Sequence, residues 1–188
     1  MSNESSEYFG KYRGTVTDNE DPLKLGRIRA KVPAVFGEHN SGWALPCAPY
    51  AGKGVGFFCI PPVEALVWIE FESGDPQMPI WTGGFWGSGD TPEETAAPDI
   101  KILKTASATI KLDDTSGSES ITLETTSGLE LVMDQDGIKL KSESITLETT
   151  SGLKIIMGQE GIELSNSSQK VKIGTSGVSI NDGALEVM

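Results

Sequence analysis

The sequence has few positive charges for its size. Its 188 residues include 15 lysines and arginines against 27 aspartates and glutamates, which gives a formal net charge of −12 and a pI of about 4.5. Nucleic-acid binding is driven by lysine and arginine contacts to phosphate, and adsorption to anionic lipid needs the same positive charge. The composition therefore disfavours a nucleic-acid partner and a stable association with a membrane surface.

Long apolar segments are also missing. No apolar run approaches the ~18 residues that a transmembrane helix needs. The N-terminal segment MSNESSEYFG has neither the basic start nor the apolar core of a signal peptide. We therefore expect the protein to be made and folded in a cytoplasm without a signal peptide.

Cysteine and histidine, the usual zinc ligands, are scarce. The cysteines are Cys47 and Cys59, and the single histidine is His39. In a reducing compartment the two cysteines are expected as small buried thiols, with a disulfide between them as the alternative. Because zinc sites normally use three or four closely spaced ligands, the sequence predicts no metal and no cofactor.

The two halves of the chain differ in composition. All 13 aromatic residues lie at or before Trp86, and no proline, aromatic residue or cysteine follows Pro98. The intervening segment Gly87–Pro98 is small, acidic and proline-containing, which is typical of a linker. The predicted boundaries are a first domain over residues 1–88, a linker over 89–98 and a second domain over 99–188.

The first half is predicted to be a small antiparallel β domain. Residues 27–32 (RIRAKV) alternate apolar and basic side chains with the period of a half-buried strand. Residues 65–71 (ALVWIEF) are rich in β-branched and aromatic side chains. Five short strands without a clear helix indicate a closed barrel. The predicted strands are Tyr8–Thr17, Arg27–Val32, Gly54–Ile60, Ala65–Phe71 and one that begins with Pro79–Thr82 and runs into Gly83-Gly84.

The second half contains an internal repeat. Ser118–Leu131 (SESITLETTSGLEL) and Ser142–Ile155 (SESITLETTSGLKI) are identical at twelve of fourteen positions and lie 24 residues apart. Within this unit, pairs of apolar residues separated by one other residue recur every seven to nine residues. Each pair predicts a minimal strand with two side chains on one face. Ile100/Ile102 and Ile110/Leu112 are interpreted as earlier, looser copies.

Strands this short predict an oligomer, because one chain buries too little apolar surface to offset the entropy of ordering its backbone. We expect a homotrimer in which three chains wind around one axis into a prism, with Ile, Leu and Val inside and Thr, Glu, Lys and Ser outside. About 11 strands at a spacing of ~4.8 Å would make it roughly 50 Å long. The predicted core residues are Ile121, Leu123, Leu129, Leu131, Ile138, Leu140, Ile145, Leu147, Leu153, Ile155, Ile162, Leu164, Val171 and Ile173.

Several motifs of the first half follow one another in a recognisable order. They are Leu25–Pro33 (LGRIRAKVP), Gly42–Tyr50 (GWALPCAPY), Gly54–Pro62 (GVGFFCIPP), Val67–Phe71 and Gly74–Gly83 (GDPQMPIWTG). Over residues 8–87 this half resembles the OB-fold domain of the phage baseplate spike and VgrG family, including the short baseplate assembly proteins called V. The second half resembles that family's trimeric β-helical needle. The implied fold is all-β, with an N-terminal OB-fold barrel followed by an intertwined triple-stranded β-helix formed by a homotrimer.

The resemblance implies a structural function and no enzyme. The expected protein is the central spike of a contractile phage tail or phage-tail-like injection baseplate. Its OB end would dock on a trimeric hub protein, and its needle would point at the target envelope and contact the membrane transiently during puncture. It would assemble in the bacterial cytoplasm and become part of a virion tail or an injection particle.

The C-terminal residues resemble the blunt ends of spikes that carry a separate PAAR-type tip protein. Other short spikes end in a paired-histidine motif that binds iron, but no histidine follows His39, so no metal is carried over. The expected contacts with the tip protein are Val178, Ile180, Asn181, Asp182, Leu185, Val187 and Met188.

Catalytic or metal chemistry is weakly supported by the remaining polar residues. Glu70 and Glu72 are expected on one face of a strand, where a solvated pair is favoured over a glycosidase carboxylate pair. Asp134–Gly137 (DQDG) is interpreted as a turn whose glycine has a positive φ, since a calcium loop would need a third ligand and a bidentate glutamate. His39 is expected to make ordinary hydrogen bonds in a loop.

Two binding functions remain as alternatives. Arg27, Arg29 and Lys31, with the aromatic residues Trp43, Phe57, Phe58 and Trp68, would suit an OB fold that stacks single-stranded nucleic acid. The acidic net charge disfavours nucleic acid. The aromatic residues are instead expected in a barrel core or a trimer interface, and the basic strand is expected to face an acidic partner or a neighbouring protomer. The second alternative is a trimeric fibre or adhesin that recognises a surface receptor, which the absence of aromatic residues from the second half disfavours.

Overall fold

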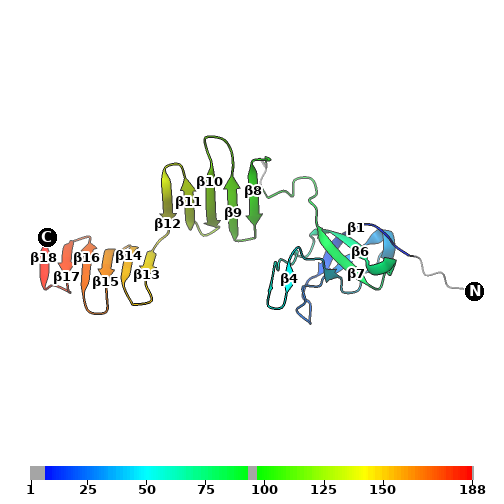
Figure 1. Ribbon diagram of the computed structural model, residues 1–188, viewed down its shortest axis with the longest axis horizontal. Coiled ribbons are helices and arrows are strands. Elements are labelled where there is room, and N and C mark those ends of the chain that lie inside the picture. Colours follow the sequence, from blue (N-terminus) through cyan, green and yellow to red (C-terminus); the bar gives the residue numbers. More distant parts are fainter. Residues whose placement is uncertain (1–6, 93–96, 188) are drawn as a thin grey trace, which may run out of the picture. The chain divides into compact units, whose positions relative to one another are not determined.

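A computed structural model describes residues 7–92 and 97–187 of the chain (Figure 1). The chain divides into two compact units, Met1–Thr91 and Pro92–Met188, which are described separately. The regular secondary structure of both units is almost entirely β-strand. In the described ranges, no helix has the length and apolar character needed to cross a membrane.

The N-terminal unit is built on a five-stranded sheet with the order β2-β1-β6-β7-β3. Neighbouring strands are antiparallel except β3 and β7, which are parallel. The bridges Ile28↔Ala44 and Lys31↔Asn40 extend the pairing beyond the named strands. The strands are β1 (Tyr12–Asp18), β2 (Arg29–Lys31), β3 (Leu45–Pro46), β6 (Leu66–Phe71) and β7 (Pro79–Gly84).

The core of this unit follows the alternation of its strands. Along β6, Val67, Ile69 and Phe71 are buried while the residues between them are partly exposed, as the two-residue period of a strand requires. The aromatic rings of Tyr8, Tyr12 and Phe36 pack on Phe71, with centroid separations of 5.5–6.0 Å. The other buried apolar residues are Val16, Ile28, Ala30, Val32 and Ala44.

Four of the five predicted strands of this half are present as β1, β2, β6 and β7, with different bounds. One-turn helix α1 (Pro33–Phe36) was not predicted, and the 3-10 turn η1 (Glu72–Gly74) follows β6. Gly54–Ile60 is not one strand. The chain reverses at Lys53-Gly54, so β4 (Ala51–Gly52) pairs with β5 (Val55–Gly56) in a small hairpin, and Phe57–Ile60 is irregular.

The prediction of two buried thiols is wrong. Cys47 and Cys59 are both exposed and free. Each lies beside the β4–β5 hairpin, in a segment that contributes no residue to the buried core.

The C-terminal unit consists of two antiparallel meanders, in which each strand pairs with its neighbours in sequence (Figure 1, green to yellow and orange to red). The first contains β8 (Ile100–Lys104), β9 (Ala108–Asp113), β10 (Ser120–Thr125), β11 (Glu130–Asp134) and β12 (Gly137–Lys141). The second contains β13 (Ile145–Glu148), β14 (Lys154–Gly158), β15 (Gly161–Ser165), β16 (Lys170–Gly174), β17 (Gly177–Ile180) and β18 (Leu185–Val187).

The 24-residue sequence repeat is also a structural repeat. In the first copy the Thr125 hydroxyl accepts a hydrogen bond from the backbone N–H of Leu129, at 3.3 Å. In the second copy Thr149 accepts the same bond from Leu153, at 3.2 Å. Because a threonine hydroxyl closes each turn, the repeated TTSGL motif forms the same connection between strands twice.

Strand pairing within one chain is more complete than the sequence argument assumed. The connections between strands are as short as two residues, as at Gln159-Glu160, which suits antiparallel hairpins. Consecutive strands therefore satisfy each other's backbone groups, and what one chain leaves uncovered is the two faces of each meander.

Candidate functional site

One face of each meander carries two rows of apolar side chains. In the first meander the cross-strand pairs Leu112↔Ile121 and Ile121↔Met133 begin one row, and Met133↔Ile138 completes it. Directly paired residues of antiparallel strands lie on the same face. The second row consists of Leu103, Ile110, Leu123, Leu131 and Leu140.

The second meander continues this pattern across all six of its strands. Register pairs such as Leu147↔Ile155 and Ile155↔Leu164 place one apolar residue of every strand in each row. No polar residue interrupts either row. One row is Ile145, Met157, Ile162, Ile173, Val178 and Val187, and the other is Leu147, Ile155, Leu164, Val171, Ile180 and Leu185.

The opposite face of the second meander is mostly polar. Its central row pairs Thr146 with Ile156, then Glu163 with Lys172 and Ser179. Each meander is therefore amphipathic, although none of the C-terminal residues whose side chains are described is buried in a single chain. Leu147, for example, is 54% exposed. We call the two rows of both meanders together the apolar face.

The predicted core residues fall on this apolar face. Twelve of them occupy the two rows, while Leu129 and Leu153 directly precede β11 and β14. The sequence prediction missed Met133 and Met157, which follow the predicted pairs by two residues and lie 24 residues apart. This repeat spacing is the signal that could have found them.

One early repeat copy was assigned to the wrong residues. Leu103 pairs with Ile110 on the apolar face, whereas Ile102 pairs with Lys111 on the other face. The turn closed by the hydrogen bond from Thr105 N to Ala108 O sets this register. Ile100 and Ile102 therefore do not belong to the rows, and Lys101 occupies the place opposite Leu112.

The expected tip residues divide into two groups. Val178, Ile180, Leu185 and Val187 extend the apolar rows to β18, the last strand in the sheet order. The remaining described pair, Asn181 and Asp182, forms the turn before β18, with φ of 50° and 52°. Met188 lies outside the described residues.

Asn181 and Asp182 tie this turn to the start of β16. The Asn181 side-chain oxygen accepts a 2.8 Å bond from Lys170 N, and Asn181 N donates to Lys170 O at the same distance. The Lys170 ammonium lies 2.7 Å from the Asp182 carboxylate, which raises the pKa of Lys170. Both residues thus have a structural task in the turn.

The basic residues of the first domain have partners within the chain. Arg27 forms a 2.6 Å ion pair with Asp21, and Lys31 forms one of 2.7 Å with Glu38. The Arg29 guanidinium lies 4.7 Å from the centroid of the Trp43 ring, a cation–π geometry. These contacts use the positive charges that the sequence argument assigned to an acidic partner or a neighbouring protomer.

The other polar candidates make local contacts. Glu70 pairs with Lys11 at 2.6 Å, and Glu72 opens η1 instead of sharing the β6 strand. Asp134 accepts bonds from the backbone N–H groups of Asp136 and Gly137, whose φ is +132°, so the predicted turn is confirmed. His39 lies in the turn after α1. Over residues 7–92 and 97–187, no group of three metal-ligating side chains occurs.

Known families match both units. Residues 12–86 match the type VI secretion system/phage-baseplate injector OB domain, and residues 140–186 match the phage baseplate V C-terminal trimerisation domain. The second match covers nearly all of the second meander and its apolar face. This match supports a homotrimer.

Two curated relatives come from Vibrio cholerae. The actin cross-linking toxin VgrG1 is 28% identical over 124 residues, which is 59% of this chain and 11% of the relative. The type VI secretion system spike protein VgrG3 is 28% identical over 125 residues, which is 60% of this chain and 12% of the relative. The chain thus spans only about a tenth of the length of these relatives. With an injector OB domain followed by a baseplate V trimerisation domain, and with VgrG proteins among its relatives, the chain is a baseplate-spike protein of the VgrG-like type.

Proposed function

We propose that this protein is the central spike of a contractile phage tail or phage-tail-like injection baseplate, and that it acts mechanically rather than as an enzyme. Residues 1–88 form the hub-docking OB domain, 89–98 the linker, and 99–188 the needle that points at the target envelope. The spike assembles in the bacterial cytoplasm and becomes part of a virion tail or an injection-particle baseplate. Sheath contraction supplies the force, so the needle needs stiffness and slow unfolding.

The observation that carries this proposal is the uncovered apolar face. Full burial of an aliphatic side chain is worth roughly 1.5–3 kcal/mol, and these side chains are about half exposed in one chain. Three copies that turn this face toward a common axis would bury the remainder. Their polar faces, with Thr146, Glu163 and Lys172, would remain in water.

The proposed needle is an intertwined prism of three chains. Eleven described strands, β8 to β18, contribute from each chain, and at ~4.8 Å per strand the prism would be roughly 50 Å long. Closed packing around an axis covers the apolar faces and protects the strand edges. Such a rod is suited to transmitting force along its axis.

At its C-terminal end the needle is proposed to bind a separate tip protein of the PAAR type. The apolar rows run without interruption to Leu185 and Val187, and β18 is the outermost strand of its sheet. Three such ends would form a small apolar platform bordered by free strand edges. Exposed apolar patches and free edges are typical binding surfaces.

Deletion of Asn181–Met188 tests the tip proposal. We expect the truncated chain to remain trimeric and to lose capture of a PAAR-type protein in a pull-down. Because Asn181 also anchors Lys170, a second deletion of Leu185–Met188 leaves that anchor in place and should give the same loss. Unchanged capture by either trimer would contradict the platform.

The spike function itself is tested by assembly. Full-length trimer should bind a trimeric hub protein at the end of an inner tube, and labelled chain should appear at the baseplate centre in negative-stain images of assembled particles. The OB domain without residues 99–188 is the control for trimer-dependent docking. Label found only on peripheral fibres would support the adhesin function instead.

A further inference from the structure

A second uncovered apolar surface lies on the OB domain. Five large side chains around the β4–β5 hairpin are each between 51% and 67% exposed. The neighbouring buried core involves none of them. We call these five residues the hairpin surface: Leu25, Tyr50, Val55, Phe57 and Phe58.

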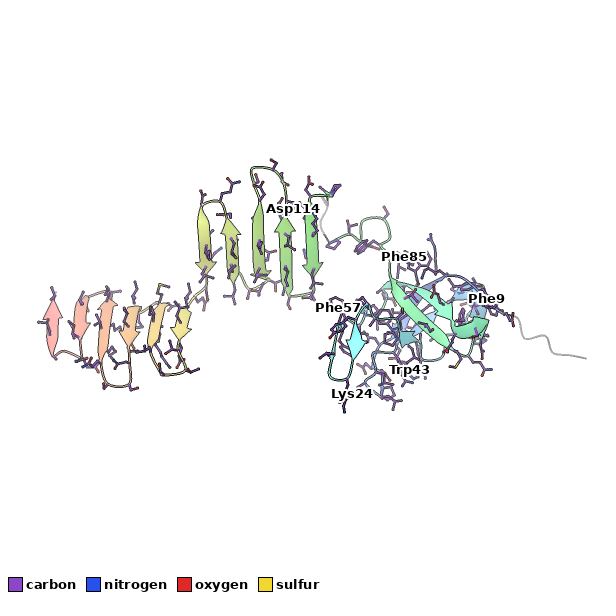
Figure 2. All side chains as sticks on the ribbon, in the orientation of Figure 1. Phe9, Lys24, Trp43, Phe57, Phe85 and Asp114 are labelled. Atoms are coloured by element: carbon purple, nitrogen blue, oxygen red, sulfur yellow. The ribbon has the colours of Figure 1, made fainter. Side chains whose placement is uncertain are left out.

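The hairpin surface has a defined geometry. Phe57 N donates a 2.9 Å hydrogen bond to Tyr50 O, which closes the hairpin. The Phe58 ring covers Gly26, where an added Cβ would lie 3.1 Å from the ring, and Trp81 Nε1 donates to Gly26 O at 3.0 Å. Beside these residues lies an open, mainly apolar groove of about 1010 Å³. Figure 2 shows Phe57 at the hairpin, on the opposite side of the domain from Phe9.

The charge of this segment differs from that of the rest of the chain. Leu45–Val63 contains one charged residue, Lys53, and no acidic residue, in a protein of net charge −12. Acidic side chains that face each other on two copies of the chain repel, because like charges oppose association. The hairpin surface can approach a second copy without repulsion between acidic side chains, and the charged residues beside it are Lys24 and Lys53.

We infer that the hairpin surface packs against the OB domain of a neighbouring copy in the same trimer. This inference depends on the homotrimer in the proposed function. A trimer formed by the C-terminal unit brings three OB domains together through short linkers, which raises their effective concentration to roughly the millimolar range. At this concentration an apolar surface without acidic residues associates with a neighbouring OB domain, and no other protein is needed. The hub would then bind a different surface of the OB domain.

The exposed cysteines provide the measurement. Cys47 and Cys59 both line the groove beside the hairpin. In full-length trimer purified without any other protein, we expect maleimide labelling of these thiols to be at least tenfold slower than that of glutathione. Phe57→Asp should restore fast labelling while light scattering still reports a trimer.

Phe9→Asp is the matched control, since Phe9 is 67% exposed on another surface. In this variant the labelling of Cys47 and Cys59 should remain slow. Val55→Asp, on the exposed hairpin strand, replaces Phe57→Asp if that variant fails to fold. Fast labelling of the wild-type trimer would overturn the inference, and protection that appears only on addition of a hub protein would assign the surface to the hub. Protection unchanged in both hairpin variants would also overturn it, whereas a wild-type chain that is not trimeric would refute the proposed function.

Discussion

At the scale of single residues, Asp21 is the clearest case of a charge placed inside the fold. Its side chain is 2% exposed and accepts hydrogen bonds from the backbone N–H groups of Leu23, Leu25 and Arg27, as well as from the Arg27 guanidinium. The bond from Arg27 is the main cause that holds the pKa of Asp21 far below its usual value. One carboxylate thus organises the loop between β1 and β2.

Asp21→Asn should lower the denaturant midpoint of the OB domain at pH 7, because the partly buried Arg27 loses its counter-charge. A carboxylate whose pKa is depressed by folding contributes stability that is present above its unfolded pKa, ~3.9, and lost as the pH falls below it. The urea midpoint of the wild type should therefore decrease as the pH falls below about 4. The urea midpoint of Asp21→Asn should decrease less over the same pH range. Urea unfolding followed by tryptophan fluorescence measures both.

Glu38→Gln is the control for this effect. Glu38 also forms a short ion pair, but its side chain is 88% exposed, and exposed pairs contribute little to stability. Its midpoint at pH 7 should stay close to that of the wild type. Equal midpoints for Asp21→Asn and the wild type would show that the buried pair does not stabilise the loop.

At the scale of elements, each meander is a sheet with one apolar and one polar face, and alternation along its strands is sufficient to produce both. Leu147 and Thr146 are adjacent on β13 and face opposite sides. In a single chain both faces would meet water. A charged substitution at Leu147 and the same substitution at Thr146 should therefore have different effects only if other chains cover the apolar face.

Leu147→Asp should abolish trimer formation, because it places three charges around the axis of the prism. Ile155→Asp, its cross-strand neighbour, should do the same, and the milder Leu147→Ala should cost about 2–5 kcal/mol per chain if the site is buried in the trimer. Thr146→Asp should be tolerated. Light scattering and denaturant unfolding of all four variants provide the comparison.

Identical midpoints for Leu147→Asp and Thr146→Asp would contradict the assignment of inner and outer faces. A monomeric chain predicts this result, since Leu147 is already 54% exposed in one chain.

The tight turns of the meanders give a second prediction at this scale. Gly161 begins β15 with a φ of +114°, and a Cβ there would lie 1.9 Å from Ile173 O. Gly161→Ala should therefore force β15 and β16 apart, beyond the ~1–3 kcal/mol cost of a side chain in this backbone conformation. Thermal unfolding of the trimer should show that Gly161→Ala loses more stability than this conformational cost alone.

Gly137→Ala provides the comparison. Gly137 begins β12 with a φ of +132°, but a Cβ there would meet no atom within 4 Å. The stability of this variant should therefore decrease only by the conformational cost of the added side chain. If both variants unfold at the same temperature, the close approach between β15 and β16 does not determine stability.

At the scale of the whole molecule, the chain joins two units with different sources of stability. The OB unit has a buried core of its own, with residues such as Val16, Ile28 and Ile69 fully covered. The C-terminal unit has no buried residue among its described side chains. The second unit therefore depends on association, in agreement with its match to a trimerisation domain.

The full chain should form a trimer of about 60 kDa from subunits of 20.0 kDa. Because association stabilises the C-terminal unit, its unfolding midpoint should rise with protein concentration, whereas that of the OB core should change little. Multi-angle light scattering and unfolding at two concentrations measure both. A folded monomer at micromolar concentration would refute the trimer.

Much of this organisation follows from local properties of the chain. The change of composition near residue 90 predicted two units, and the 24-residue repeat predicted a series of short strands with one apolar face. Alternation and turn residues are sufficient for these inferences, because side-chain direction in a strand depends only on the position along it. The all-β class was accessible for the same reason, whereas the family was accessible from the order of the motifs in the first half.

Other features required the tertiary structure. Leu103 rather than Ile102 lies on the apolar face because the turn at Thr105 sets the register of β8 against β9. Asp21 pairs with Arg27 because the loop between them folds back on itself. Register, loop closure and burial arise from contacts between residues that are distant in sequence or brought together by a turn. Those contacts leave Cys47 and the hairpin surface exposed in one chain, although the neighbouring core residues are buried.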